Sequence, residues 1–192
     1  MEAVEGKAMK ATADLKEEHG GVKVMLGILE KACDGLVAGK GVDPQHLDQI
    51  LEFLMVFVDK CHHAKEEEYL FPTLEQAGVS KEGGPIGVML LEHRKGREFI
   101  RGMNEALPGV KRGDGQTVTR FIRNARGYRE LLLAHIDKED NVLYPMADAL
   151  LSEEKDRELT KDFERVEEER VGHGKHEEFH RMMDRLKAVY RV

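Results

Sequence analysis

The sequence contains no tryptophan and few aromatic residues of any kind, which make up 6% of the chain. Its two cysteines, Cys33 and Cys61, are too few for a disulfide scaffold and lie where a helical pattern can bury them, so we expect reduced core thiols. No stretch approaches the roughly 20 apolar residues that a bilayer span needs, and the N-terminal segment lacks the apolar run of a signal peptide. These absences predict a cytoplasmic protein that has no membrane partner.

The sequence also lacks a block of basic residues. Its formal net charge is −7, and the lysines and arginines are scattered among acidic residues. Because a phosphate backbone is bound mainly through clustered positive charge, nucleic acid is not an expected partner. Charged residues form 35% of the chain and hydrophobic residues 41%, a balance typical of amphipathic helices. We therefore expect an all-α protein.

Four segments place apolar residues at the three- and four-residue spacing of a helix with one buried face. The first ends near the glycines of 34–41, and the second opens with Asp43 as N-cap and Pro44 at the first helical position. The third follows a break at 78–85, and the fourth follows a polar loop at 108–116 and is expected to include Val142 on its buried face. Short connections favour antiparallel neighbours, so the sequence predicts an up-down-up-down four-helix bundle.

An additional C-terminal helix, rich in charge, is predicted after Ser152, its expected N-cap. Gly172 and Gly174 lie where they can break or kink it. No Pro/Ser-rich linker precedes it. We therefore expect residues 1–152 to form the bundle and residues 153–192 to pack on it within the same domain.

The second and fourth segments share a weak repeat, in which CHHAKEEEYLFP aligns with AHIDKEDNVLYP. The alignment pairs His62 with His135 and Glu66 with Glu139, so each segment carries His-x-x-x-Glu. Residues four apart lie on one face of a helix, one turn above each other. Each pair can therefore present an imidazole nitrogen and a carboxylate inward at one height, as metal ligands require.

Histidine also interrupts the apolar face of the first segment, at His19, and of the third, at His93. A buried carboxylate without a partner is costly, so two glutamates that face these histidines in one core require a cation. Bundle cores host dinuclear carboxylate sites. Imidazole combined with carboxylate suits iron better than magnesium or calcium, and we expect iron ahead of zinc or manganese.

This constellation resembles the hemerythrin-like family, the HHE cation-binding domains, over about residues 10 to 150. The family pattern is a histidine on the first and third helices and His-x-x-x-Glu on the second and fourth. The resemblance implies a hemerythrin-like four-helix bundle around two iron ions in an oxo- or hydroxo-bridged diiron centre, with Glu66 and Glu139 as the bridging carboxylates. The matching residues are His19, His62, Glu66, His93, His135 and Glu139.

One position departs from the oxygen-carrying members of that family, which have a second histidine four residues after the one on the third helix. Here that position is Arg97. The adjacent His63 would supply the missing imidazole, because neighbouring helix residues diverge by about 100°, enough for His62 and His63 to reach different ions. We therefore predict His63 as a seventh ligand.

Two acidic residues compete with the predicted bridging carboxylates. Glu67 lies one turn after His63, and Asp140 would give a longer His-to-Asp spacing. The repeat alignment favours Glu66 and Glu139 over these two.

The stretch HEEFH matches the pattern of zinc proteases, in which two histidines bind zinc and the glutamate acts as base. No convincing third zinc ligand follows His180. We expect a packed helix instead, on which His173, His176 and His180 share a face and close one end of the site.

The resemblance implies a centre that binds or reacts with a small ligand, O₂, NO or H₂O₂, and exchanges electrons with a redox partner. Three functional classes fit: a reversible carrier or sensor, an enzyme that consumes peroxide or reduces O₂ or NO, and a protein that stores or hands over iron. The arginine in place of a histidine disfavours a stable oxygen carrier. A structural bundle without metal is the alternative outside these classes.

Overall fold

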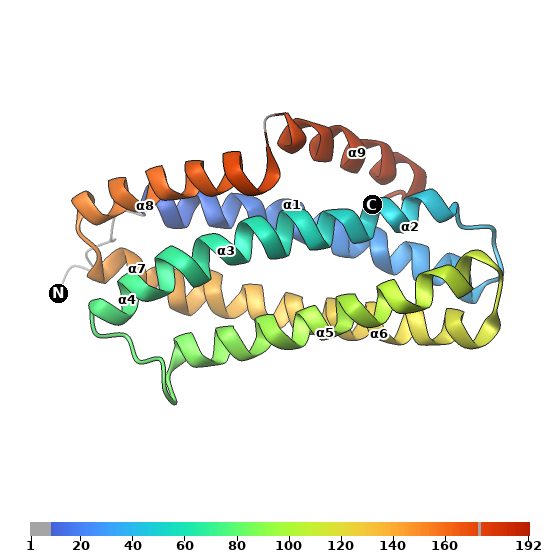
Figure 1. Cartoon of the computed structure of the whole chain (residues 1–192), viewed down its shortest axis with the longest axis horizontal. Helices are drawn as coiled ribbons and strands as arrows, with labels where there is room; N and C mark the ends of the chain where they lie inside the picture. The colour runs from blue at the N-terminus through green and yellow to red at the C-terminus, as the bar shows by residue number, and fades with distance from the viewer. Residues whose placement is uncertain (1–8, 173) are drawn as a thin grey trace.

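The computed structural model describes residues 9–172 and 174–192, and within them every regular element is helical. Four long runs alternate in direction and lie side by side, and a further helical segment covers one side of them (Figure 1). The predicted all-α bundle is confirmed. The runs are α1 (Lys10–Val37); α2 (Pro44–Phe53), η1 (Leu54–His62), α3 (His63–Lys65), η2 (Glu66–Leu70) and α4 (Phe71–Gln76); α5 (Pro85–Lys111); and α6 (Gly115–Lys138), η3 (Glu139–Leu143) and α7 (Tyr144–Leu150).

The second and fourth runs each contain a π-helical turn at the same place in the repeat, η2 and η3. In each turn, the residue before a proline donates its N–H to the carbonyl five residues back, that of Glu66 or Glu139. A regular helix would drive the rings of Pro72 and Pro145 into the carbonyl four residues earlier. The wider turn avoids that clash, so the repeated proline fixes a wider turn that begins at each glutamate.

The π-helical turn corrects one part of the predicted helical pattern. The three- and four-residue spacing put Val142 on the buried face, but its side chain is 52% exposed, whereas Leu143 is 1% exposed. A π turn adds a residue, so the buried positions run four apart through Glu139, Leu143 and Ala147.

The predicted loop at 108–116 is shorter than expected, because α5 continues through Pro108 to Lys111. Proline near the end of a helix removes only one hydrogen bond. Gly109 faces Thr117 so closely that a Cβ there would lie 2.3 Å from the Thr117 hydroxyl oxygen. The glycine therefore lets the ends of α5 and α6 approach.

The C-terminal segment comprises α8 (Glu153–Val166), η4 (Glu167–Val171) and α9 (Lys175–Tyr190), which pack along α1 and η1 (Figure 1). Ser152 caps α8 by accepting from the N–H of Lys155, as predicted. Gly172 and Gly174 have positive φ values of 88° and 79°, which glycine adopts at little cost, and they follow the end of η4 at Val171 and precede the start of α9 at Lys175. That residues 153–192 belong to the same domain as the bundle stays a prediction. Among the described residues, no helix is long and apolar enough to span a bilayer.

Two apolar clusters lie towards opposite ends of the bundle. One is built around Leu26, Leu54 and Phe121, and the other around Leu15 and Leu74. Between them along each run lie the buried histidines and glutamates. This layer of ionisable groups, with apolar packing on both sides, is where the fold concentrates its chemistry.

Candidate metal centre

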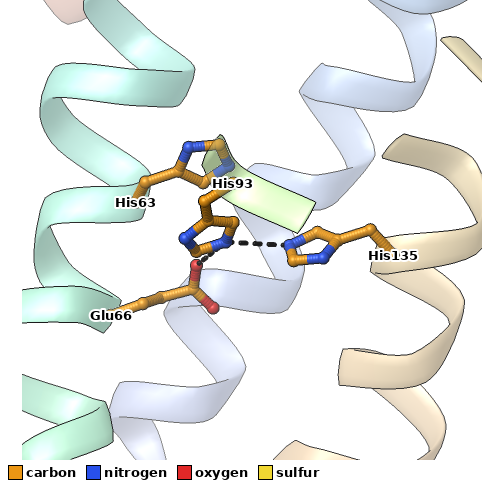
Figure 2. Close-up of side chains that lie close together, drawn as sticks. All are labelled: His63, Glu66, His93 and His135. Atoms are coloured by element: carbon orange, nitrogen blue, oxygen red, sulfur yellow. Dashed lines mark hydrogen bonds and ion pairs between the residues drawn. The ribbon is translucent and has the colours of Figure 1, made fainter. Parts of the chain in front are cut away.

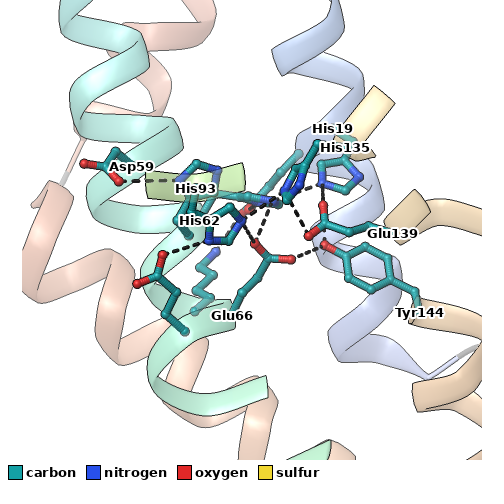
Figure 3. Close-up of polar contacts among 12 residues, drawn as sticks. His19, Asp59, His62, Glu66, His93, His135, Glu139 and Tyr144 are labelled. Carbon is teal, nitrogen blue, oxygen red and sulfur yellow. Dashed lines mark hydrogen bonds and ion pairs between the residues drawn. The ribbon is translucent and has the colours of Figure 1, made fainter. Parts of the chain in front are cut away.

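The structure brings the seven predicted ligand residues into one buried layer (Figures 2 and 3). They form two groups, and in each group one candidate ligand atom per residue lies within 4.8 Å of the others. All four helical runs contribute to the layer. The first group contains His63, Glu66, His93 and His135, and the second contains His19, His62 and Glu139.

Each glutamate lies between the two groups. Oε2 of Glu139 is 3.4 Å from Nε2 of His19, and its Oε1 is 3.1 Å from Nε2 of His135. Oε2 of Glu66 likewise approaches one histidine of each group, at 3.8 and 3.4 Å (Figure 3). This is the placement that a carboxylate bridging two ions requires.

Imidazole nitrogens face one another in pairs. Nε2 of His19 is 3.0 Å from Nε2 of His62, and the same 3.0 Å separates Nε2 of His93 from that of His135. In all four rings Nδ1 lies against a carboxylate, which favours a proton on Nδ1 and leaves Nε2 for a metal ion or, without one, for a further proton. Two facing Nε2 lone pairs repel unless a proton or a metal ion lies between them. Two nitrogens at right angles on one ion, with bonds of about 2.1 Å, lie about 3.0 Å apart, so the spacing fits a shared metal ion.

Carboxylates from neighbouring helices hold the outer nitrogens of these four rings. Glu67 and Asp140, the alternative ligands considered from the sequence, lie in such outer positions, whereas Glu66 and Glu139 lie in the layer itself. Carboxylates in these positions fix the tautomer of a ligating histidine and make it more basic. The pairs are Glu18 with His62, Asp140 with His19 and Glu67 with His93, each at 2.7 Å, and Glu92 with His135 at 2.9 Å.

A cation stands behind each outer carboxylate. Lys65 binds Glu18, Lys138 binds Glu92, Lys23 binds Asp140 and Arg97 binds Glu67. The arrangement repeats, so that α1 corresponds to α5 and the second run to the fourth. The guanidinium of Arg97, which occupies the place of a family histidine, lies 2.8 Å from Glu67 and 2.6 Å from Asp59. Arg97 thus pairs with an outer carboxylate and does not replace the absent histidine as a metal ligand.

Several buried atoms of the layer lack a hydrogen-bond partner among the described residues. They are Oε2 of Glu66, both carboxylate oxygens of Glu139 and Nε2 of His63. Leaving such atoms unpaired is costly, most of all for carboxylates. A metal ion would satisfy them all, and the set of imidazole and carboxylate donors fits iron, zinc or manganese.

The pKa shifts of the buried glutamates and histidines also indicate that positive charge stabilises the layer. Burial and the neighbouring charge of Glu139 raise the pKa of Glu66 well above its usual range. Burial alone would raise the pKa of Glu139 too, but His135 and His19 lower it well below its usual range. Burial alone would lower the pKa of His135, but Glu139 and Glu92 raise it to about 9. Without a metal ion, the layer therefore retains protons to offset its carboxylates.

His63 makes the two groups unequal. Its repeat counterpart is Ile136, so the fourth run offers no matching imidazole. The ring of His63 stacks on that of His93 with centroids 3.8 Å apart, and its Nδ1 lies 3.4 Å from Asp59. Its side chain therefore points into the first group, where Figure 2 shows it.

Tyr144 belongs to the layer but was not predicted. Its hydroxyl donates to Oε1 of Glu66 at 2.7 Å, and its ring stacks on His19. The repeat aligned it with Phe71, whose ring stacks on His93 in the corresponding place. The alignment of Phe71 with Tyr144 was the signal available in the sequence, although it did not show that the hydroxyl of Tyr144 reaches a glutamate.

A narrow space borders the histidines of the layer. Aliphatic side chains form the rest of its wall. The space has no room for a water-sized molecule unless side chains move. Only small ligands can therefore reach the histidines from this side. The lining residues are His19, His62, His63, His135, Val22, Val58, Leu132 and Ile136.

The histidines of HEEFH lie outside this layer. His176 and His180 line a separate cavity between α1 and α9, while His173 lies outside the described residues. Thus His176 packs against the bundle, at Phe57, but contributes no donor to either group.

Known proteins are similar to this chain in sequence. The family model of the hemerythrin HHE cation binding domain matches residues 10–147. An uncharacterized protein of Mycobacterium tuberculosis is 27% identical over 162 residues, 84% of this chain and 63% of that protein. The iron-sulfur cluster repair protein YtfE of Edwardsiella ictaluri is 31% identical over 125 residues, 64% of this chain and 56% of that protein. The matches thus span less than two thirds of these relatives, and no solved structure matches significantly.

Proposed function

Because the chain belongs to the hemerythrin HHE cation-binding domain family, we propose that its buried layer holds two iron ions and binds or reacts with O₂, NO or H₂O₂. The observation that carries this proposal is the position of Glu66 and Glu139, each between histidines of both groups and each with at least one buried oxygen that has no hydrogen-bond partner among the described residues. The cytoplasmic location stays a prediction from the sequence.

The two groups offer unequal numbers of donors. His63, His93 and His135 would hold one ion and His19 and His62 the other, while both glutamates lie near histidines of both groups. The group of His19 and His62 offers one imidazole fewer, so it would leave more room for an external ligand.

When bound, a ferrous pair supplies the open position and the electrons that a small oxidant needs. The protein residues set the conditions. Outer carboxylates hold the proton on Nδ1 of four histidines, which keeps Nε2 free for metal. The hydroxyl of Tyr144 holds a proton beside Glu66, and the apolar clusters on both sides exclude water.

The narrow space beside the histidines limits the substrate. Its aliphatic wall and lack of room favour a diatomic molecule or peroxide over an organic substrate, because a smaller ligand requires less movement of the side chains. Electrons would come from a separate redox partner.

A second candidate is iron handling. It is favoured by similarity to proteins named for iron-sulfur cluster repair, in Edwardsiella ictaluri and, at 37% identity over 90 residues, in an Enterobacter species. Such a role requires the layer to release iron, whereas its donors are 0 to 3% exposed.

The test is to reduce the iron-loaded protein anaerobically and mix it with O₂, NO or H₂O₂ while recording absorption and iron retention. A rapid spectral change with iron retained is expected. Sustained O₂ evolution from peroxide would identify an enzyme, and a stable reversible spectrum a carrier. Transfer of iron to a chelator, with no reaction towards the three ligands, would overturn the proposal in favour of iron handling.

A further inference from the structure

A second polar site lies outside the buried layer, in a cavity of about 300 Å³ between the bundle and the C-terminal segment. Its wall comes from α1, from η1 and its neighbour α2, from η4 and from α9. Phe57, Phe179 and Met183 form an apolar side, and Glu18, Glu167 and His176 line the polar side. Much of the wall thus lies beyond residues 10–147, the part that the family model matches.

The polar side carries a set of possible metal donors. Glu18, Glu167 and His176 each offer one ligand atom, and these atoms lie within 4.8 Å of one another. Nε2 of His176 is buried and has no hydrogen-bond partner among the described residues. His180 follows one helical turn later and lines the same cavity, with its ring 5.5 Å from that of His176.

The charge around this cavity favours a cation. Asp14 and Glu17 add two carboxylates to those of Glu18 and Glu167. Lys65 is the cation held inside the cluster, where it binds Oε1 of Glu18 and Oε1 of Glu167, each at 2.5 Å. Lys10 also lies 3.8 Å from Asp14, so two ammonium groups face four carboxylates and the net charge is still negative. The second oxygen of Glu167 remains for another ligand.

We propose that Glu18, Glu167 and His176 form a third metal site, which binds one divalent ion such as Zn²⁺. Mixed imidazole and carboxylate donors suit borderline metals, and the cavity leaves room for water ligands. The HEEFH stretch thus gains its further ligands from α1 and η4, where the sequence after His180 supplied none.

The outer ion is coupled to the buried layer through one side chain. Oε2 of Glu18 accepts from Nδ1 of His62 at 2.7 Å, while Glu18 also faces the cavity. A divalent ion on Glu18 withdraws charge from that hydrogen bond and so makes His62 a weaker donor to its own ion. Occupation of the cavity therefore shifts the absorption spectrum of the iron-loaded protein.

The experiment is equilibrium dialysis of the iron-loaded full chain against Zn²⁺, with zinc and iron both measured. One zinc per chain is expected to bind without loss of iron and with a change in the iron spectrum. No additional zinc, or zinc that only replaces iron, would overturn the proposal.

Variants assign the zinc to this cavity. His176→Ala and, independently, Glu167→Gln should weaken the additional zinc by more than about tenfold, since loss of even an outer partner costs about 10- to 100-fold in affinity. His46→Ala is the matched control, because His46 binds Tyr190 away from the cavity. The buried layer is the same in the wild type and in the three variants, so any zinc that it takes up would be equal in all four proteins. A difference between them therefore reports on the cavity even if the iron proposal fails. Equal zinc binding by all four proteins contradicts the assignment.

Discussion

Tyr144 donates a hydrogen bond to Oε1 of Glu66 across 2.7 Å, and so ties the fourth helical run to the second inside the ligand layer. In the other half of the repeat, Phe71 stacks on a histidine in the same way but has no hydroxyl to offer. The two glutamates therefore differ: one has a hydroxyl donor, while both oxygens of Glu139 have none among the described residues.

Tyr144→Phe should fold and retain iron, because phenylalanine already occupies the equivalent position. The loss of a hydrogen bond to a buried carboxylate should destabilise the metal-free protein by about 1 to 3 kcal/mol. It should also alter the iron spectrum and the rate of reaction with H₂O₂. Tyr69→Phe is the control, because its hydroxyl binds Arg165 instead. An unchanged spectrum and rate in Tyr144→Phe would show that this hydroxyl has no influence on the centre.

His63→Ile should weaken one of the two irons selectively, because it gives the second run the same residue as Ile136 in the fourth. The first group then keeps only two imidazoles. Iron titration followed by gel filtration should give fewer than two irons per chain, with one ion retained. Two tightly held irons in this variant would remove His63 from the ligand set.

Lys65→Met should destabilise the metal-free protein by about 3 kcal/mol, because it removes the ammonium that pairs with the buried carboxylate of Glu18. This figure is at the lower end of the usual range because Glu18 keeps its hydrogen bond to His62 and Glu167 is 40% exposed. Lys138→Met is the matched control from the other half of the repeat, where the lysine is itself 40% exposed, and should cost less than about 1 kcal/mol. Urea unfolding measures both. Equal losses of unfolding free energy in the two variants would show that the burial of Lys65 does not increase its contribution to stability.

Iron affinity should rise with pH. In the metal-free protein His135 has a pKa of about 9, because Glu139 and Glu92 outweigh the effect of burial. Below that pH it carries a proton that iron must displace, so the affinity for Fe²⁺ should increase by about tenfold per pH unit for each proton released. Anaerobic competition with a chelator between pH 6.5 and 8.5 measures this. A flat or falling affinity would contradict the displacement of a proton from His135 by iron.

The helical pattern of the sequence was enough to place six candidate ligands on the buried faces of four helices, since four-residue spacing puts His62 with Glu66 and His135 with Glu139 on one face. His63 was added only through the family resemblance, because the family histidine is absent at Arg97. The pattern misplaced Val142, because the π-helical turn beginning at Glu139 adds a residue that periodicity alone does not show. The recurring proline was the local signal for that turn.

The outer carboxylates could not be assigned from one helix at a time. Glu18 and Glu92 each precede a histidine of the layer on the same helix, yet each binds a histidine of a different run. Such contacts depend on how helices pack, which periodicity does not specify. The shared Glu-His pair in the first and third runs was the available signal, and it extends the repeat to all four helices.

The most direct test of the account is the iron stoichiometry of the full chain. Metal-free protein would be loaded anaerobically with Fe²⁺, exposed to air, passed through a desalting column and measured for iron and absorption. The account predicts two irons per chain with the near-ultraviolet bands of a bridged ferric pair, and fewer than two in Glu139→Gln. One iron or none in the wild-type chain, under conditions that retain its fold, would contradict it.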